Sequence, residues 1–443
     1  MTTHRRHSFS SSLSYETDEI DEFNEFNDYS GLIEEKIMNE EYKIWKKNSS
    51  YLYDLLIADT LESTLFTCQW FKDFYRGEDY RMQRILMGVH LKNDQQNYIQ
   101  IGAVELPLNG ATIMSKRSEE GINGSYDYNY GIFKNEWIEN DDGDVPNCKR
   151  LSIVQMIKHE GAINRARYNP KDQNIIATKS EYKNVYIFDR AKHPDKPANT
   201  SSSCRPELTL NGHTEQGHGL SWNSFKNGHI IDSSKDMTIC YWDISGNSDG
   251  NMMEPLRIFK GPKSCIQDVE WHAFNPNMFG SVDHDRNLLI WDSRCSCPVG
   301  SVQAHEKELT TLAFNPINEV VLVTGSADKN LNLWDIRNLK IKLYTLKNHE
   351  SNIVDVKWSP HDENILASAS ADKKVNLWNI NKIGAEQTSE KVEDGPPELL
   401  FMHGGHIDKI SELSWNPLVP LMIASTANNI IHIWQPVKYN NYE

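Results

Sequence analysis

Short apolar runs separated by polar turns occupy most of the chain, and one form of run recurs. Residues 365–379, ILASASADKKVNLWN, hold two apolar stretches joined by an Ala-Asp-Lys turn. Residues 324–338, TGSADKNLNLWDIRN, have the same form. Apolar stretches of this length on either side of a tight turn are typical of a β-hairpin. The pattern therefore predicts a chain of many short strands.

The hairpins belong to a longer repeated frame. A histidine stands 28 or 29 residues before a tryptophan in four copies, which begin at His213, His305, His349 and His406. A fifth copy begins at His159 and ends on a phenylalanine, and a sixth begins at Pro262. Six copies in register resemble the WD-repeat family, whose fold is a β-propeller. The resemblance to this family covers residues 150–438.

The resemblance also implies a role for the recurring histidines. In the family, the His, a Ser or Thr, the turn Asp and the Trp of one repeat form a buried hydrogen-bonded chain. In the copy that begins at His305, the other members are expected to be Ser326, Asp328 and Trp334. Breaking such a chain leaves a buried polar group without a partner, at a cost of about 1–3 kcal/mol. We therefore expect these histidines to be structural, and neither metal-binding nor catalytic.

Six repeats leave the region before residue 150 to be explained. Three strands without the Trp-Asp signature are predicted there, at 64–70, 81–90 and 97–106. We expect them to form a first blade, which gives an all-β, seven-bladed WD-repeat β-propeller over residues 49–438. In WD-repeat proteins the outermost strand of the last blade commonly comes from the N-terminal side. Residues 51–59 are expected to take that place.

Three further segments differ from the strand pattern. Residues 32–48 have apolar positions at helical spacing, on one stripe with Ile44 and on a second with Trp45, which predicts an N-terminal α-helix. The preceding residues 1–31 are rich in serine and then in acids, and they are predicted to be a disordered tail. Residues 108–148 and 381–401 interrupt the repeats as long polar insertions. Loops of this length inside a compact repeat are often functional.

Charge and cysteine usage restrict the class of partner. The 443-residue chain has a formal net charge of −16, which argues against a partner bound through its phosphates, so we expect no direct binding to nucleic acid. The seven cysteines have no zinc-finger spacing, and we interpret them as reduced thiols. Because no apolar run approaches the roughly 18 residues that span a bilayer, we expect no membrane association.

Segments between and before the repeats resemble a narrower family. They are NEEYKIWKKNSSYLYDL (39–55), HEGAINRARYNP (159–170), ADKNLNLWDIRNLKIKL (327–343), KIGAEQ (382–387) and EDGPPELLFMHGGH (393–406). These stretches resemble the retinoblastoma-associated histone-binding WD-repeat family, the Nurf55-like and multicopy-suppressor-of-Ira-like histone chaperone subunits. The resemblance implies a histone-binding adaptor, shared by chromatin assembly, deacetylase, Polycomb and nucleosome-remodelling complexes. It further implies a monomer within these hetero-complexes, without a cofactor, mainly nuclear and partly cytoplasmic.

The family implies two binding surfaces, of which the first is a side groove between the N-terminal helix and the Pro-Pro loop. It is expected to take the first helix of histone 4. The implied groove residues are an apolar floor, an acidic pair for a histone arginine and two stiffening prolines: Tyr51, Leu52, Phe401, Met402, Glu393, Asp394, Pro396 and Pro397. The acidic stretch that the family has before the prolines is broken here by Lys391 and Val392.

The second implied surface is an axial face that grips an Arg/Lys-rich peptide such as the histone 3 tail. Its expected residues are Glu62, His90, Asn164, Arg165, Gln216, His218, Gln267, Asn352 and Lys409. Family glutamates are replaced by Ala162, Gln216, Gln267 and Asn352, and family aromatic positions by His218 and Val354. Each lost carboxylate removes an attraction to a basic peptide. We therefore expect binding of the histone 3 tail to be weakened.

Functions of other classes remain as alternatives. The boxes Trp291-Asp292-Ser293-Arg294 and Trp334-Asp335-Ile336-Arg337 fit a W-D-x-R pattern seen in cullin-type ubiquitin-ligase substrate receptors. A ribosome assembly WD-repeat factor is a third hypothesis. The chain has no G-x-S-x-G, phosphate-loop or H-E-x-x-H motif and no Cys/His cluster with metal-ligand spacing. We therefore expect neither catalytic residues nor a metal site.

Overall fold

The computed structural model describes residues 40–77, 80–90, 96–107, 150–196, 204–246, 251–388, 392 and 394–437. The tail predicted at 1–31 and the insertion predicted at 108–148 lie outside these residues. The chain divides into two compact units, Met1–Ser49 and Ser50–Glu443. Among the described residues there is no helix with the length and apolar character needed to cross a bilayer.

The N-terminal helix runs further than its sequence predicts. It is helical from the first described residue, 40, to residue 52, whereas the predicted end was 48. The Ser49 hydroxyl donates to the Lys46 carbonyl over 2.8 Å, so this serine is satisfied inside the helix and does not end it. Along the helix Trp45 is 9% exposed and Ile44 is 61% exposed, so of the two predicted stripes only that of Trp45 is buried.

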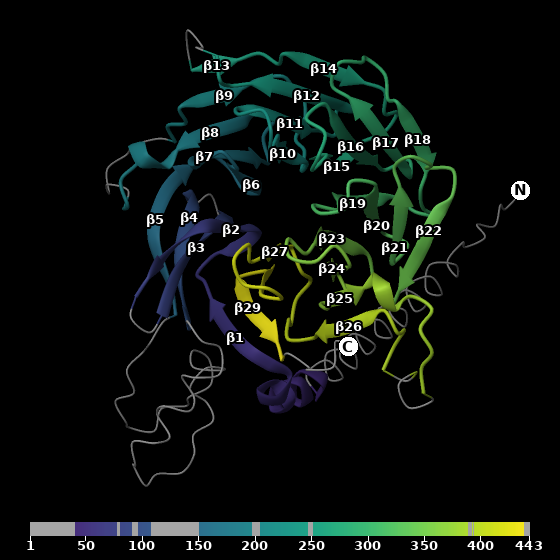
Figure 1. The fold of residues 1–443 in the computed structure, drawn as a ribbon. Helices are drawn as coiled ribbons and strands as arrows, with labels where there is room; N and C mark the ends of the chain where they lie inside the picture. The colour runs from purple at the N-terminus through teal and green to yellow at the C-terminus, as the bar shows by residue number, and fades with distance from the viewer. Residues whose placement is uncertain are drawn as a thin grey trace, which may run out of the picture. The chain divides into compact units, whose positions relative to one another are not determined.

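Residues Ser50–Glu443 form a ring of β-sheets around a central opening, with seven sheets in the described residues (Figure 1). We call the sheets blades 1 to 7. From the inner strand outward, blades 1 to 3 consist of β2 (Thr64–Arg76), β3 (Tyr80–His90), β4 (Asn97–Pro107) and β5 (Leu151–His159); of β6 (Ile163–Asn169), β7 (Asp172–Ser180), β8 (Val185–Asp189), β9 (Leu208–Leu210) and β13 (Met252–Met253); and of β10 (Leu220–Trp222), β11 (His229–Ser233), β12 (Thr238–Asp243) and β14 (Arg257–Lys260).

Blades 4 to 6 consist of β15 (Ile266–Trp271), β16 (Met278–Asp283), β17 (Asn287–Asp292) and β18 (Gly300–Gln303); of β19 (Leu309–Phe314), β20 (Val321–Ser326), β21 (Asn330–Asp335) and β22 (Lys342–Lys347); and of β23 (Ile353–Trp358), β24 (Ile365–Ser370), β25 (Val375–Asn379) and β26 (Leu399–His403). Blade 7 consists of β27 (Glu412–Trp415), β28 (Ile423–Ala427), β29 (Ile430–Pro436) and β1 (Tyr53–Thr60). Short 3-10 turns follow β8 and β25, at Arg190–Lys192 and Ile380–Lys382. The predicted all-β, seven-bladed propeller with an N-terminal helix is confirmed.

The ring is closed by strands from opposite ends of the chain. β1 pairs antiparallel with β29, with Leu56 opposite Trp434 and Ile57 opposite Ile433. The segment predicted to complete the last blade, 51–59, overlaps β1, but Tyr51 and Leu52 belong to the helix. Figure 1 shows β1 as the outer strand beside β29. This pairing joins two parts of the chain that are far apart in sequence, so closure depends on the last blade.

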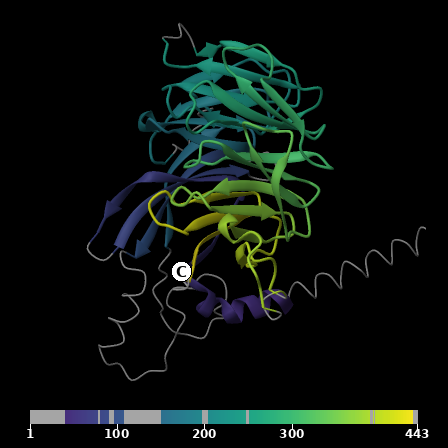
Figure 2. The ribbon, with the colours of Figure 1, turned by 45° about the vertical axis from the view of Figure 1, so that its right-hand side comes forward.

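Apolar side chains fill the spaces between neighbouring blades. Five tryptophans are fully buried, at Trp70, Trp242, Trp291, Trp378 and Trp434. Clusters of buried apolar residues join adjacent blades, as where Val356 and Trp358 of blade 6 pack with Leu331 and Leu333 of blade 5. A single blade is apolar on both faces, so stacking around the ring is what removes these faces from water. The hairpin of β2 and β3 projects from the ring (Figure 2), and Phe74 and Tyr75 on it are exposed.

A bulge recurs near the start of the inner strands. The pairing register shifts at Leu65/Thr67, Ile163/Arg165, Ile266/Asp268, Leu309/Thr311 and Ile353/Asp355. A bulge bends its strand and turns side chains in a new direction. Its repetition at one height in five blades brings the residues that follow it together around the central opening.

Candidate functional site

The predicted buried chain of hydrogen bonds is present in blade 5, with one different member. His305 Nδ1 lies 3.0 Å from the Asp328 carboxylate, and its Nε2 lies 2.9 Å from the hydroxyl of Thr324. Trp334 Nε1 donates to that same hydroxyl over 2.9 Å. The prediction of Ser326 is therefore wrong, and Thr324 takes its place. Ser326 lies two residues further along β20, next to the turn, where its hydroxyl donates to the Glu308 carbonyl and accepts from the Asp328 amide.

The histidines of the other repeats are held in the same way. Beside blade 6, His349 contacts Asp372 over 2.8 Å and Ser368 over 2.7 Å. His159 contacts the Thr178 hydroxyl of blade 2 over 2.8 Å. All five histidines of the frame are less than 9% exposed, at His159, His213, His305, His349 and His406. Their partners and burial support a structural role.

Blade 3 has an ionic version of this arrangement, which the repeat pattern did not reveal. Asp232 replaces the hydroxyl, 3.0 Å from His213 Nε2, while His213 Nδ1 lies 3.0 Å from Asp236. The Lys179 ammonium, from β7 in blade 2, forms an ion pair with Asp232, and both side chains are fully buried. Although burial alone lowers the pKa of His213, Asp232 and Asp236 raise it to about 11, so this imidazole is cationic at neutral pH. Two buried cations therefore face two carboxylates between blades 2 and 3.

The residues predicted for the axial face lie at or near the inner strands, around one mouth of the central opening. Glu62, Asn352 and Lys409 are exposed, whereas His90, Asn164, Arg165, Gln216, His218 and Gln267 are partly exposed. Burial, followed by the nearby charge of Arg165, lowers the pKa of His218 to about 4, so this ring is neutral at physiological pH. The mouth therefore combines one carboxylate, that of Glu62, with neutral amides and imidazoles at the positions predicted for it.

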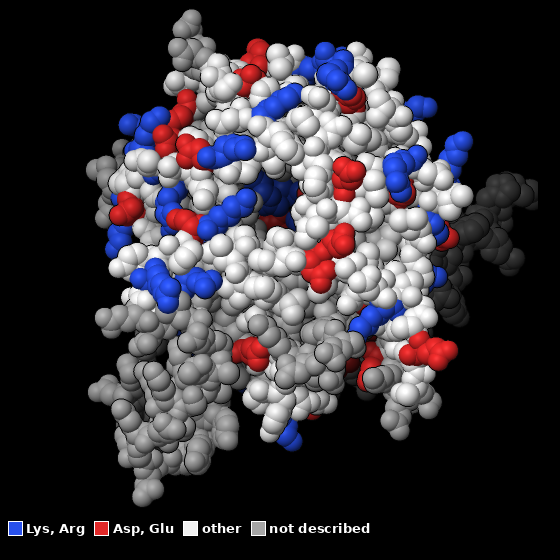
Figure 3. All heavy atoms as spheres, viewed as in Figure 1, with Lys and Arg blue, Asp and Glu red and all other residues white. Residues whose placement is uncertain are grey.

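Below this mouth, charged side chains line the channel in two layers. One layer holds the residues three positions before the repeat aromatic of each inner strand: Thr67, Arg165, Gly219, Asp268, Thr311, Asp355 and Glu412. The other layer holds the residues one position before it: Gln69, Arg167, Ser221, Glu270, Ala313, Lys357 and Ser414. Blue and red atoms are both visible in the central opening in Figure 3. Since side chains in a strand alternate, positions two apart point the same way.

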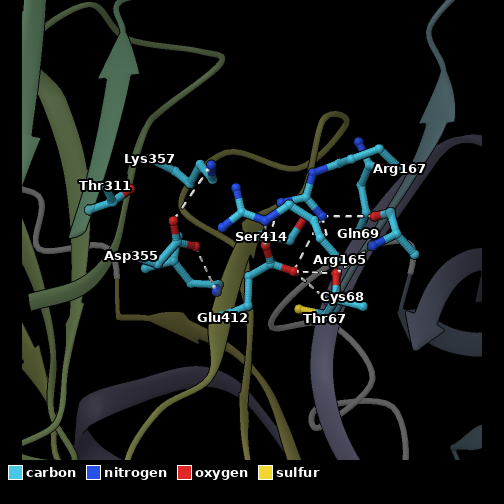
Figure 4. A network of polar contacts seen from close by, with 12 residues as sticks. Thr67, Cys68, Gln69, Arg165, Arg167, Thr311, Asp355, Lys357, Glu412 and Ser414 are labelled. Atoms are coloured by element: carbon cyan, nitrogen blue, oxygen red, sulfur yellow. Dashed lines mark hydrogen bonds and ion pairs between the residues drawn. The ribbon is translucent and has the colours of Figure 1, made fainter. Parts of the chain in front are cut away.

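These layers connect neighbouring blades through polar contacts (Figure 4). Glu412 of blade 7 accepts from the Cys68 amide over 2.8 Å and from the Thr67 hydroxyl over 2.6 Å, and it pairs with the Arg167 guanidinium. In the second layer, Glu270 accepts from the Phe314 amide over 2.8 Å. An inner strand has a free edge, and these side chains satisfy its exposed amides. The channel is thus a structural network that holds the ring together.

Arg165 belongs to this network more than to the mouth. Its guanidinium lies 2.6 Å from the Asp268 carboxylate and 3.8 Å from that of Glu412, and its side chain is 14% exposed. The charge predicted to contact a peptide is therefore engaged by two acids inside the channel. No sequence signal indicates this pairing, because the partners come from blades 4 and 7.

The predicted floor of the side groove lies at the outer edges of blades 6 and 7. Tyr51 is 79% exposed and Leu52 is partly exposed. Phe401 lies in β26, and its ring makes an edge contact with that of Tyr53 at 5.3 Å between centroids. Met402, the next residue of β26, is 44% exposed. Consecutive residues of a strand point to opposite faces of the sheet, so Phe401 and Met402 do not share one floor.

The Pro-Pro loop is tied to blade 6 at its base. Residues 381–401 were predicted as one insertion, but β26 begins at Leu399, so its last part is strand. The Gly395 carbonyl accepts from the Gln387 side chain over 3.0 Å, and Glu398 is buried with its carboxylate 3.2 Å from the Tyr344 hydroxyl. Asp394 is exposed and the two prolines, Pro396 and Pro397, are partly exposed. Glu393 lies outside the described residues.

Comparison with known families agrees with this architecture. Residues 40–108, which include β1 and three strands of blade 1, match a family model described as histone-binding protein RBBP4 or a component of the CAF1 complex. Residues 253–292, 296–335 and 340–379 match the model of the WD domain, G-beta repeat. The first match covers the blade that lacks the repeat signature, and the others cover blades that have it. The chain therefore belongs to the RBBP4-type family of histone-binding WD-repeat proteins.

Proposed function

We propose that this protein is a histone-binding adaptor that takes the first helix of histone 4 at the outer edges of blades 6 and 7. The observation that carries the proposal is the match of residues 40–108 to the RBBP4-type histone-binding model. The chain acts in this proposal as a non-catalytic member of chromatin complexes, chiefly in the nucleus. A rigid propeller suits an adaptor, because a preorganised surface loses little entropy when a partner binds.

The exposed residues near β1 and β26 suit an amphipathic helix with a basic residue. Tyr51 offers a large exposed ring, and Leu52 lies beside it in sequence. The Asp394 carboxylate is exposed and is followed by two prolines, which limit the freedom of the loop. A helix laid into a groove uses apolar anchors at helical spacing, and a carboxylate at the rim can pair with an arginine of the helix. We leave Met402 out of the floor, since it points away from Phe401.

The proposal predicts that charge reversal at the rim weakens histone 4 binding. Tyr51→Asp combined with Asp394→Lys removes an apolar anchor and repels a histone arginine, so the dissociation constant for a peptide of the first helix should rise at least about tenfold. Isothermal titration calorimetry with the full chain measures this. Since both residues are exposed, the thermal unfolding midpoint should stay unchanged.

A matched control carries the same chemistry elsewhere. Tyr75→Asp changes an exposed tyrosine of blade 1, and Glu254→Lys changes an exposed acid between β13 and β14. This double variant should bind like the unaltered protein. Equal affinity of both double variants for the peptide would show that the edge of blades 6 and 7 is not the binding surface.

We further propose that the axial mouth binds a basic histone 3 tail only weakly. The mouth offers Gln216, Gln267 and Asn352 where carboxylates would attract lysine and arginine, and the Arg165 cation lies just beneath it. The expected result is a dissociation constant weaker than about 10 μM for a histone 3 N-terminal peptide at physiological salt. Changing Gln216 and Gln267 together to Glu should tighten binding at least about fivefold. Tight binding by the unaltered protein, or no gain in the variant, would refute the proposal.

A further inference from the structure

Three buried histidines meet between blades 6 and 7. His403 ends β26, His406 lies in the crossing to blade 7, and His432 lies in β29. One ring nitrogen of each lies within 4.8 Å of the corresponding atom of the others. His403 Nε2 and His432 Nδ1 are 3.1 Å apart, and the rings of His406 and His432 have centroids 4.2 Å apart. The three side chains are between 0% and 4% exposed.

The cluster exists because blade 7 departs from the repeat pattern at three positions. The turn residue that is Asp328 in blade 5 and Asp372 in blade 6 is Asn428 here, and its amide oxygen accepts instead from the Thr64 hydroxyl. His406 Nδ1 therefore has no hydrogen-bond partner in the described part of the chain. His432 occupies the position, two before the tryptophan, where blades 5 and 6 have Asn332 and Asn376.

The third departure is His403. It stands three residues before the repeat histidine, where blades 4 and 5 end on the apolar Val302 and Leu346. A buried imidazole at an otherwise apolar position loses hydration unless it gains a polar partner. Here it gains a second imidazole and a tyrosine, which is the arrangement expected of a site rather than of a core.

The other ring nitrogens of two of these residues are already held. The Tyr53 hydroxyl lies 2.7 Å from His403 Nδ1, and the Ser425 hydroxyl lies 2.7 Å from His406 Nε2. Ser425 in turn accepts from Trp434 Nε1 over 3.1 Å. Histidines that bind metals are commonly oriented by a hydrogen bond on the far nitrogen, which fixes the tautomer. Two of the three imidazoles have this support, with the nearer nitrogens facing one another.

We propose that His403, His406 and His432 form a site for one divalent transition-metal ion of the zinc class. The ligand atoms are His403 Nε2, His406 Nδ1 and His432 Nδ1. The 3.1 Å separation of the first and last is close to the edge of about 3.3 Å that follows from tetrahedral bonds of about 2.0–2.1 Å. Three neutral imidazoles favour zinc, copper, nickel or cobalt over magnesium or calcium.

The protonation state of the cluster suits this role. Burial lowers the pKa of His432 to about 4 and the pKa values of His403 and His406 well below the ordinary range. All three rings are therefore neutral at physiological pH, and neutral imidazole is the form that binds a metal. The ion would join the outer strand of blade 6 to the strand that pairs with β1, so it would reinforce the closure of the ring.

A second group of metal-ligating side chains does not carry the same inference. His213, Asp232 and Cys240 also bring their ligand atoms together. The Lys179 ammonium already forms an ion pair with Asp232, and His213 is itself cationic. A divalent cation would add to two positive charges there, whereas the three histidines of blades 6 and 7 are uncharged.

The site is tested by cobalt and zinc binding to the untagged full chain. Co²⁺ should bind with one-to-one stoichiometry and give the visible absorption of a tetrahedral nitrogen-ligated ion. Zn²⁺ should displace it and raise the thermal unfolding midpoint by at least about 3 °C, because an ion that binds the folded state alone stabilises it. His432→Asn should abolish both effects. That variant carries the residue found at the equivalent position of blades 5 and 6, so it is expected to fold.

Two controls separate this site from surface binding. His284→Asn removes an exposed histidine, and Cys295→Ser with Cys297→Ser removes an exposed thiol pair. Both variants should retain the cobalt spectrum and the zinc-induced shift. A spectrum that persists in His432→Asn, or that is lost with the two thiols, would overturn the proposal. So would the absence of stoichiometric cobalt binding by the unaltered protein.

Discussion

Replacing Lys179 by methionine should lower the free energy of unfolding by about 3–5 kcal/mol, because it leaves a buried carboxylate without its full compensation. Lys179 and Asp232 are fully buried as an ion pair, and His213 and Asp236 complete a group with two positive and two negative charges. Methionine keeps the volume of the lysine stem and removes only the charge. Urea unfolding followed by tryptophan fluorescence measures the loss.

The double variant Lys179→Met, Asp232→Ser should recover most of that stability. Serine restores the hydroxyl that Thr324, Ser368 and Ser425 provide in blades 5 to 7. It also offers an acceptor to Trp242 Nε1, which has no partner among the described residues. Replacing a buried ion pair by well-fitting neutral groups is often neutral or stabilising, whereas removing one partner is not. The coupling energy between the two sites should exceed about 2 kcal/mol.

Lys171→Met is the matched control, since Lys171 is exposed on the same blade. Its effect should stay within about 0.5 kcal/mol. If Lys179→Met costs no more than this surface change, or if the double variant is as unstable as the single one, the ionic interpretation of blade 3 is wrong.

The second large effect is expected at Glu412. Glu412→Gln keeps the shape of the side chain but removes the charge that faces Arg167 and, at 3.8 Å, Arg165. Arg165 retains Asp268, so the main loss is the uncompensated charge of Arg167. We expect the free energy of unfolding to fall by about 3 kcal/mol at neutral pH. Glu105→Gln, at an exposed acid of β4, should have no measurable effect.

The pH dependence gives this prediction a second readout. Burial alone would raise the pKa of Glu412, but Arg167 and Arg165 hold it well below its usual range. A carboxyl whose pKa is lower in the folded state contributes stability above its unfolded pKa of about 4.3, and that contribution is lost as the pH falls further. The gap between the unaltered protein and Glu412→Gln should therefore be widest at neutral pH and shrink below about pH 4. A gap that does not change with pH would point to packing instead of charge.

The repeated frame shows how far the sequence determines this protein. Six copies of one spacing require a ring of blades, because a blade that is apolar on both faces must be covered by a neighbour on each side. The strands of the first blade followed from their apolar pattern alone, although that blade has no Trp-Asp signature. The family resemblance rested on segments between the repeats, such as residues 39–55 and 393–406, and the family match agrees with it.

Only the tertiary structure decided which polar residues meet. The hydroxyl in blade 5 belongs to Thr324 and not to Ser326, since the position within the strand relative to the turn selects one of two similar residues. Phe401 and Met402 are neighbours in sequence but lie on opposite faces of β26. Arg165 was assigned to a peptide-binding mouth and is instead paired with acids of other blades.

The same reason explains the buried histidines. His403 and His406 are three residues apart, which is no metal-binding signature, and His432 lies further along the chain. They come together because consecutive blades stack and because β29 lies beside the strand that closes the ring. Periodicity in a sequence reports which face of a strand is buried, so it determines the architecture. Contacts between blades depend on residues with no fixed separation in the chain, and those only the folded ring can reveal.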